Sequence, residues 1–97
     1  MAALSEEERP VAWGRKDERA ALERALEAAA GLKVGAWTSV EAFAMLAIEA
    51  KGRPEAQKLY ESAREASTSL SDGSWESVRA LTWLVRARRE LGLDQDR

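Results

Sequence analysis

The chain has 97 residues, of which 15 are basic and 17 acidic, and it contains neither cysteine nor histidine. Its length suits one domain, 1–97, with a small core, and its nearly balanced charge argues against a surface that is basic overall. The missing residue types exclude disulfides, thiolate metal sites and the most common general base, so we expect no enzyme, no metal and no cofactor.

Residues 1–16 are predicted to form an N-terminal arm. Ser5 and Glu8 have the spacing of a capping box, and residues 11–13 are apolar, so we expect a short helical segment or an arm that covers one end of the domain. The arm lacks the apolar segment of a signal peptide. The longest apolar run, Ala42–Ile48, is too short to cross a membrane, and we expect a cytoplasmic protein.

The next two helices are predicted at about Asp17–Ala30 and Ser39–Lys51, which together make the first hairpin, 17–52. The first helix has a narrow, alanine-rich stripe that lets another helix approach closely. The second has capping-box spacing at Thr38 and Glu41 and is apolar nearly all round. A helix without a polar face is buried on several sides, so we place this one at the centre of the domain.

A second hairpin, 53–92, is predicted from the next two helices and is followed by a tail, 93–97. The third helix begins at Pro54, which suits the first helical position, and ends near Ser67. Ser74 is a suitable N-cap for the fourth helix, which runs from Trp75 to Leu91. The predicted inner stripe of this fourth helix consists of Val78, Leu81, Leu84, Val85 and Leu91.

The chain repeats itself at a distance of 38 residues. When residues 23–46 are aligned without gaps on residues 61–84, 11 of the 24 pairs are identical. A fixed period of this size is typical of stacked helical hairpins, so we predict an all-α fold of two stacked antiparallel hairpins. Because an isolated stack usually needs about three repeats, we also expect the chain to form a homodimer that covers an open end.

Trp37 and Trp75 occupy equivalent positions of the repeat, each at the start of a helix. We predict that each of them fastens a loop onto the helix beside it.

The stretch that follows Gly52 resembles the second helix of a tetratricopeptide repeat. Ala56, Tyr60 and Ala63 match that family's order of a small, a large and a small residue. The period of 38 residues departs from the 34 of the family. The resemblance implies stacked helical hairpins and a role in binding other proteins.

Arg79, Trp83 and Arg86 form the candidate partner-binding site. They recur at i, i+4 and i+7 of the fourth helix, and a helical wheel places Trp83 opposite Leu81 and Val85. We expect Trp83 either to pack on the N-terminal arm or to anchor a partner, because Trp and Arg dominate binding hot spots.

These features favour a small helical protein–protein interaction module, such as an adaptor, an inhibitor or an immunity-type factor. A second interpretation is a nucleic-acid-associated regulator that uses the basic fourth helix, where Arg88 and Arg89 join Arg79 and Arg86. An enzyme would need a polar pocket near Arg88. We expect Arg88 on the inner stripe, where it either extends its charged end to solvent or pairs with a carboxylate such as Glu49. The remaining interpretation is an engineered chain without a biological role.

Overall fold

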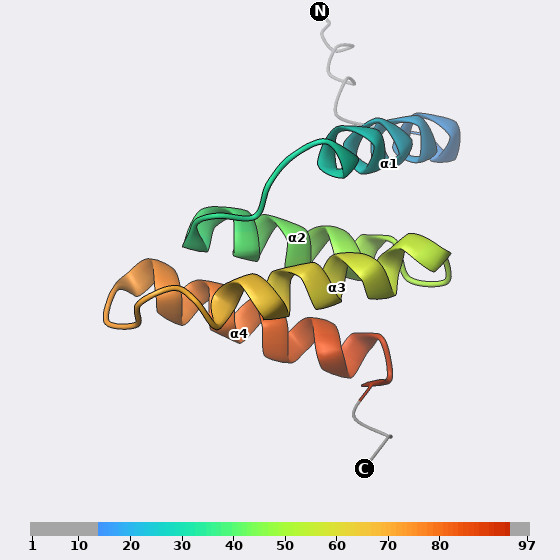
Figure 1. Ribbon diagram of the computed structural model, residues 1–97. Helices are drawn as coiled ribbons and strands as arrows, with labels where there is room; N and C mark the ends of the chain where they lie inside the picture. The colour runs from blue at the N-terminus through green and yellow to red at the C-terminus, as the bar shows by residue number, and fades with distance from the viewer. Residues whose placement is uncertain (1–13, 94–97) are drawn as a thin grey trace, which may run out of the picture.

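The fold is built from four helices, and Figure 1 shows them in the computed structural model, which describes residues 14–93. They are α1 (Arg15–Ala30), α2 (Trp37–Glu49), α3 (Pro54–Ser67) and α4 (Trp75–Glu90). No strand occurs among the described residues, so the predicted all-α class is confirmed. Most of the predicted arm, residues 1–13, and residues 94–97 of the tail lie outside the described part of the chain.

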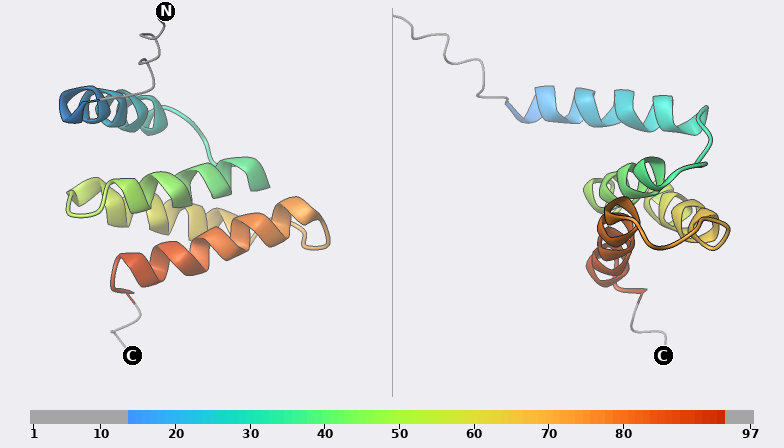
Figure 2. Two further views of the ribbon diagram at one scale, coloured as in Figure 1. Left: turned by 180° about the vertical axis from the view of Figure 1, so that it is seen from behind. Right: turned by 90° about the vertical axis from the view of Figure 1, so that its left-hand side faces the viewer.

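The helices form a stack in which α2 packs against both α3 and α4. As Figure 1 shows, α2 and α4 run in the same direction, and α3 runs back in the opposite one. α1 lies on the far side of α2, at the end of the stack, and the right-hand view of Figure 2 shows that it crosses the other helices at a steep angle. Its contact with α2 is much smaller than the contacts that α3 and α4 make there, so α1 is the most lightly held helix.

Short-range bonds and backbone geometry set several helix ends. α3 begins at Pro54, as predicted, where the missing N–H costs no hydrogen bond. Ser74 caps α4, because its hydroxyl accepts a hydrogen bond from the backbone N–H of Ser77 at 3.1 Å. The turn after α2 contains Gly52 with a φ of +92°, a conformation that favours glycine.

α2 begins at Trp37, two residues before the predicted start at Ser39. The hydroxyl of Ser39 closes the first turn by accepting a hydrogen bond from the backbone N–H of Ala36 at 3.0 Å. The predicted cap at Thr38 is therefore wrong. The N-cap residue is Ala36, and its backbone N–H, which has no partner within the helix, is satisfied by Ser39.

α2 forms the centre of the core, as its apolar sequence predicts. The buried residues of α2, α3 and α4 are small for the most part, which brings the three backbones close together. They are Val40, Phe43, Ala44, Ala47, Ala56, Leu59, Tyr60, Ala63, Ser77, Ala80, Leu84 and Ala87. In α1 the buried residue is Ala29, so its predicted close contact with another helix is limited to its C-terminal end.

α4 turns a different face to the core than its sequence predicts. Of the predicted inner stripe, Leu84 is buried, whereas three other members are exposed: Val78, Leu81 and Val85. The buried face instead combines Leu84 with the small residues of α4. Small side chains let α4 approach α2 more closely than branched ones would, and this closer packing decides which face is turned inward.

Candidate functional site

The large apolar side chains that α4 exposes share one side of the helix. Trp75 is 80% exposed, Val78 51%, Leu81 37% and Val85 60%. Their spacing of three or four residues places them in one row, which we call the α4 outer face. A row of this kind on a small domain is a candidate interaction surface, whereas single exposed apolar residues are ordinary.

A second apolar feature is a hollow of about 410 Å³ between α1, α2 and α4. We call it the Trp83 hollow, because the Trp83 side chain lines it from α4. Apolar residues make up nearly all of its lining, with one carboxylate at the edge. The lining residues are Ala25, Ala42, Met45, Leu46, Ile48, Glu49 and Trp83.

Arg79, Trp83 and Arg86 all have contacts within the chain. Trp83 is half-buried and packs against the core, so its predicted place opposite the core is wrong. The guanidinium of Arg86 lies 5.6 Å from the centre of the Trp83 ring, within the range of a cation–π contact. Arg79 donates a hydrogen bond to the Glu41 carboxylate at 3.0 Å. The three residues thus lie on the side of α4 next to the outer face, with Trp83 reaching the hollow.

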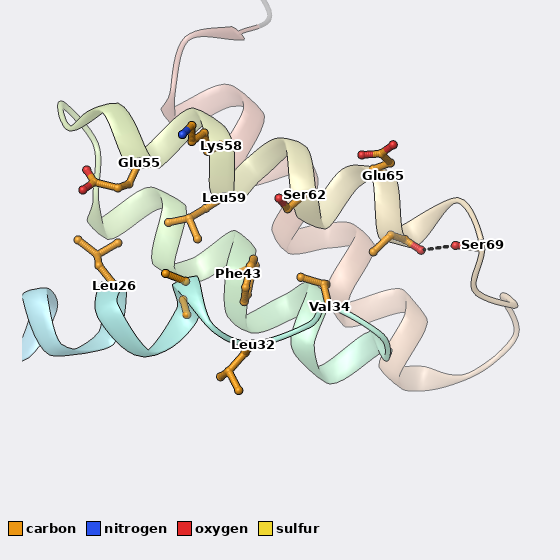
Figure 3. A pocket seen from close by; sticks show the side chains of 13 residues that line it. Leu26, Leu32, Val34, Phe43, Glu55, Lys58, Leu59, Ser62, Glu65 and Ser69 are labelled. Atoms are coloured by element: carbon orange, nitrogen blue, oxygen red, sulfur yellow. Dashed lines mark hydrogen bonds between the residues drawn. The ribbon is translucent and has the colours of Figure 1, made fainter.

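A larger hollow, of about 650 Å³, lies between α1 and α3 and is seen from close by in Figure 3. Leu26, Phe43 and Leu59 contribute apolar side chains to it, while Glu55 and Lys58 of α3 line it with charges of opposite sign. This mixed lining offers no arrangement that selects one class of ligand.

The two equivalent tryptophans differ sharply in the structure. Trp37 is half-buried, and its indole Nε1–H donates to the backbone carbonyl of Ser71 at 2.8 Å, which fastens the α3–α4 loop as predicted. Trp75 is 80% exposed, so the prediction of the same role for it is wrong. Sequence reasoning missed Trp75 as a surface residue, because Trp37 and Trp75 occupy equivalent positions of the repeat and the sequence does not distinguish them.

Arg88 is exposed on α4, so its predicted place on the inner stripe is wrong. It lines a small surface hollow with Gln57, Glu61 and Arg64. Within residues 14–93, no cluster of three or more potential metal-ligating side chains is present, and none of the helices is long and apolar enough to span a membrane. Comparisons with known proteins found no matching family model, no matching curated protein and no matching solved structure.

Proposed function

We propose that this chain is a small helical protein–protein interaction module, of the adaptor, inhibitor or immunity type, which acts by binding rather than by catalysis. The observation that carries the proposal is the α4 outer face, an exposed apolar row on a domain of only 97 residues. Such a surface favours aggregation unless a partner covers it. The 38-residue repeat and its tetratricopeptide-like pattern support the same function.

The Trp83 hollow supplies the second part of the proposed binding surface. Arg79, Trp83 and Arg86 remain the proposed partner-binding residues, with the aromatic ring at the hollow and the two guanidinium groups nearby. This combination suits an apolar helix, because Trp and Arg are the usual anchors of protein interfaces. Met45, which is 41% exposed, gives the hollow an adaptable side chain.

A nucleic-acid interface has weaker support. Such a surface needs basic side chains free to contact phosphates. Arg79 is engaged by Glu41, and Arg86 lies over the Trp83 ring, so two of the basic residues of α4 already have partners. The α4 outer face, beside these arginines, is apolar.

Photo-crosslinking in the cells that make the protein tests this proposal. A benzophenone amino acid at Met45 reports on the Trp83 hollow, and the same amino acid at Gln57, exposed on α3, is the control. We expect a discrete protein adduct from position 45 that is absent from position 57 and is weakened by Trp83→Ala. No adduct at position 45, together with salt-dependent binding of labelled double-stranded DNA, would replace this proposal with the nucleic-acid interpretation.

A further inference from the structure

The α4 outer face corresponds, by the 38-residue shift, to the face of α2 that forms the core. The corresponding pairs are Val40 with Val78, Phe43 with Leu81 and Ala47 with Val85. The α2 members are at most 9% exposed, whereas the α4 members are 37% to 60% exposed. α4 therefore carries an apolar face like the one that α2 buries, and no helix within residues 14–93 covers it.

The Trp83 hollow corresponds in the same way to the surface on which α2 packs. The pairs are Ala25 with Ala63, Ala42 with Ala80, Met45 with Trp83 and Leu46 with Leu84. Three of the second members are buried in the core, at most 6% exposed, and the fourth, Trp83, is half-buried. The first members are exposed or half-buried. α1 and α2 thus present an open version of the surface that α3 and α4 offer to α2.

We propose that the α4 outer face of one copy of this chain binds the α1–α2 surface of a second copy, as α2 packs on α3 and α4 within one chain. The inference rests on the proposed protein-binding function and names the partner. Because the two surfaces differ, the contact is head-to-tail, and each copy uses α4 toward one neighbour and the Trp83 hollow toward the other. Contacts of this type build a ring where the rotation closes and a filament where it does not.

The exposed Trp75 finds a place in this contact. Within the chain, the Trp37 indole donates to the Ser71 carbonyl at 2.8 Å. In the 38-residue repeat, Trp37 corresponds to Trp75, and Ser71 corresponds to Lys33 in the exposed α1–α2 loop. The proposed contact therefore places the Trp75 indole of one copy beside the backbone carbonyl of Lys33 of the next. The contact therefore covers a side chain that is 80% exposed and gives its N–H a hydrogen-bond acceptor.

Charge complementarity supports the same register. Arg79 and Glu41 occupy corresponding positions and already bind each other within the chain at 3.0 Å. The proposed contact between two copies therefore places Arg79 of one copy beside Glu41 of the next. A carboxylate has two oxygens with several acceptor sites, so Glu41 can accept a second guanidinium. Opposite charges at this position favour the correct register over its alternatives.

α1 also gains packing from a second copy. In the single chain, α1 buries Ala29 alone among its residues and crosses α2 steeply, whereas α3 packs extensively on α2. A docked α4 contacts α1 and α2 together. We expect α1 to turn toward the orientation that α3 has in the stack, since α1 has few contacts to give up.

Sedimentation velocity of the full chain across the micromolar range, with three variants at exposed positions, tests the proposal. Val85→Glu places a charge on the α4 outer face, and Ala42→Glu places the same charge in the Trp83 hollow. Ala20→Glu is the matched control, because Ala20 and its counterpart Lys58 are both exposed. Circular dichroism and thermal melting confirm that each variant is folded. If Val85→Glu is unfolded, Val78→Glu replaces it on the α4 outer face. If Ala42→Glu is unfolded, Met45→Glu replaces it in the Trp83 hollow.

We expect the wild type and Ala20→Glu to form species larger than the monomer, while Val85→Glu and Ala42→Glu each stay monomeric. An equimolar mixture of Val85→Glu and Ala42→Glu should form a heterodimer and nothing larger, because one intact contact remains between them. A wild type that is monomeric at every concentration overturns the inference. An Ala42→Glu variant that associates like the wild type also overturns the inference. It would show that two copies pair through their α4 outer faces and not through the Trp83 hollow. If the wild type is monomeric and Met45 cross-links to a different protein, the proposed function stands and this inference alone fails.

Discussion

Arg79 and Glu41 stand at corresponding positions of the repeat and bind each other, with 3.0 Å between Arg79 Nη2 and Glu41 Oε2. The Glu41 side chain is 14% exposed and the Arg79 side chain 69%. The ion pair links α2 to α4 at the fifth residue of each helix, and the two helices run in the same direction (Figure 1).

Removing this ion pair should have a small effect on the folding of the single chain. We expect Glu41→Gln to lower the free energy of unfolding by about 1 kcal/mol or less, because solvent screens a pair with one exposed partner. Urea denaturation at low protein concentration measures this, and a double-mutant cycle with Arg79→Met isolates the pair. A coupling energy well above about 1 kcal/mol would contradict the solvent-screened character of the contact.

Replacing the two equivalent tryptophans by phenylalanine should affect different properties: Trp37→Phe the folding stability and Trp75→Phe the self-association. Trp37→Phe loses the hydrogen bond to Ser71 and should lower the free energy of unfolding by about 1 kcal/mol. Trp75→Phe removes no bond within residues 14–93 and should leave the stability of the monomer nearly unchanged, while it weakens self-association. Urea denaturation and sedimentation measure the two effects. Equal losses of stability would show that the two rings have the same environment.

Leu84 and Leu46 form a second matched pair, because they correspond in the repeat but differ in burial. Leu84 is 6% exposed, and Leu84→Ala should cost about 2–4 kcal/mol through the cavity that it leaves in the core. Leu46 is half-buried, so Leu46→Ala should cost roughly half as much. Chemical denaturation of both variants checks this order. A larger loss for Leu46 would mean that its side of α2 is covered in the single chain.

α1 should exchange its backbone amide hydrogens faster than the rest of the stack. Helices with few buried contacts open locally at low free energy, and α1 buries little beyond Ala29. Hydrogen–deuterium exchange with mass spectrometry at low protein concentration should show fast exchange in α1 and slow exchange in α2 and α4. Raising the concentration should slow exchange in α1 of the wild type and leave it fast in Val85→Glu. Protection of α1 equal to that of α2 in the monomer would contradict its light packing.

Several features of the fold could be predicted from the sequence because they depend on neighbouring residues. Pro54 begins α3, Ser74 caps α4, and Gly52 occupies the turn after α2, each through geometry or hydrogen bonds that span a few positions. The central place of α2 follows from the run Ala42–Ile48, since a helix without a polar face is buried on several sides. The surroundings of the candidate partner-binding residues, in contrast, could not be predicted, because a helical wheel of α4 takes the apolar stripe that is in fact exposed as the inner face.

The tertiary structure alone decided which face of α4 is buried and which of two like residues is covered. Val78, Leu81 and Val85 follow a helical period as well as the small residues around Leu84 do, so periodicity cannot choose between the two stripes. The choice depends on how closely α2 approaches, and small side chains permit the denser contact. Trp37 and Trp75 are the same residue at equivalent positions, yet Trp37 has the α3–α4 loop beside it and Trp75 is exposed. Whether a side chain is buried depends on the segment that packs beside it as well as on the residue itself. Which segment lies there is decided by the arrangement of the helices.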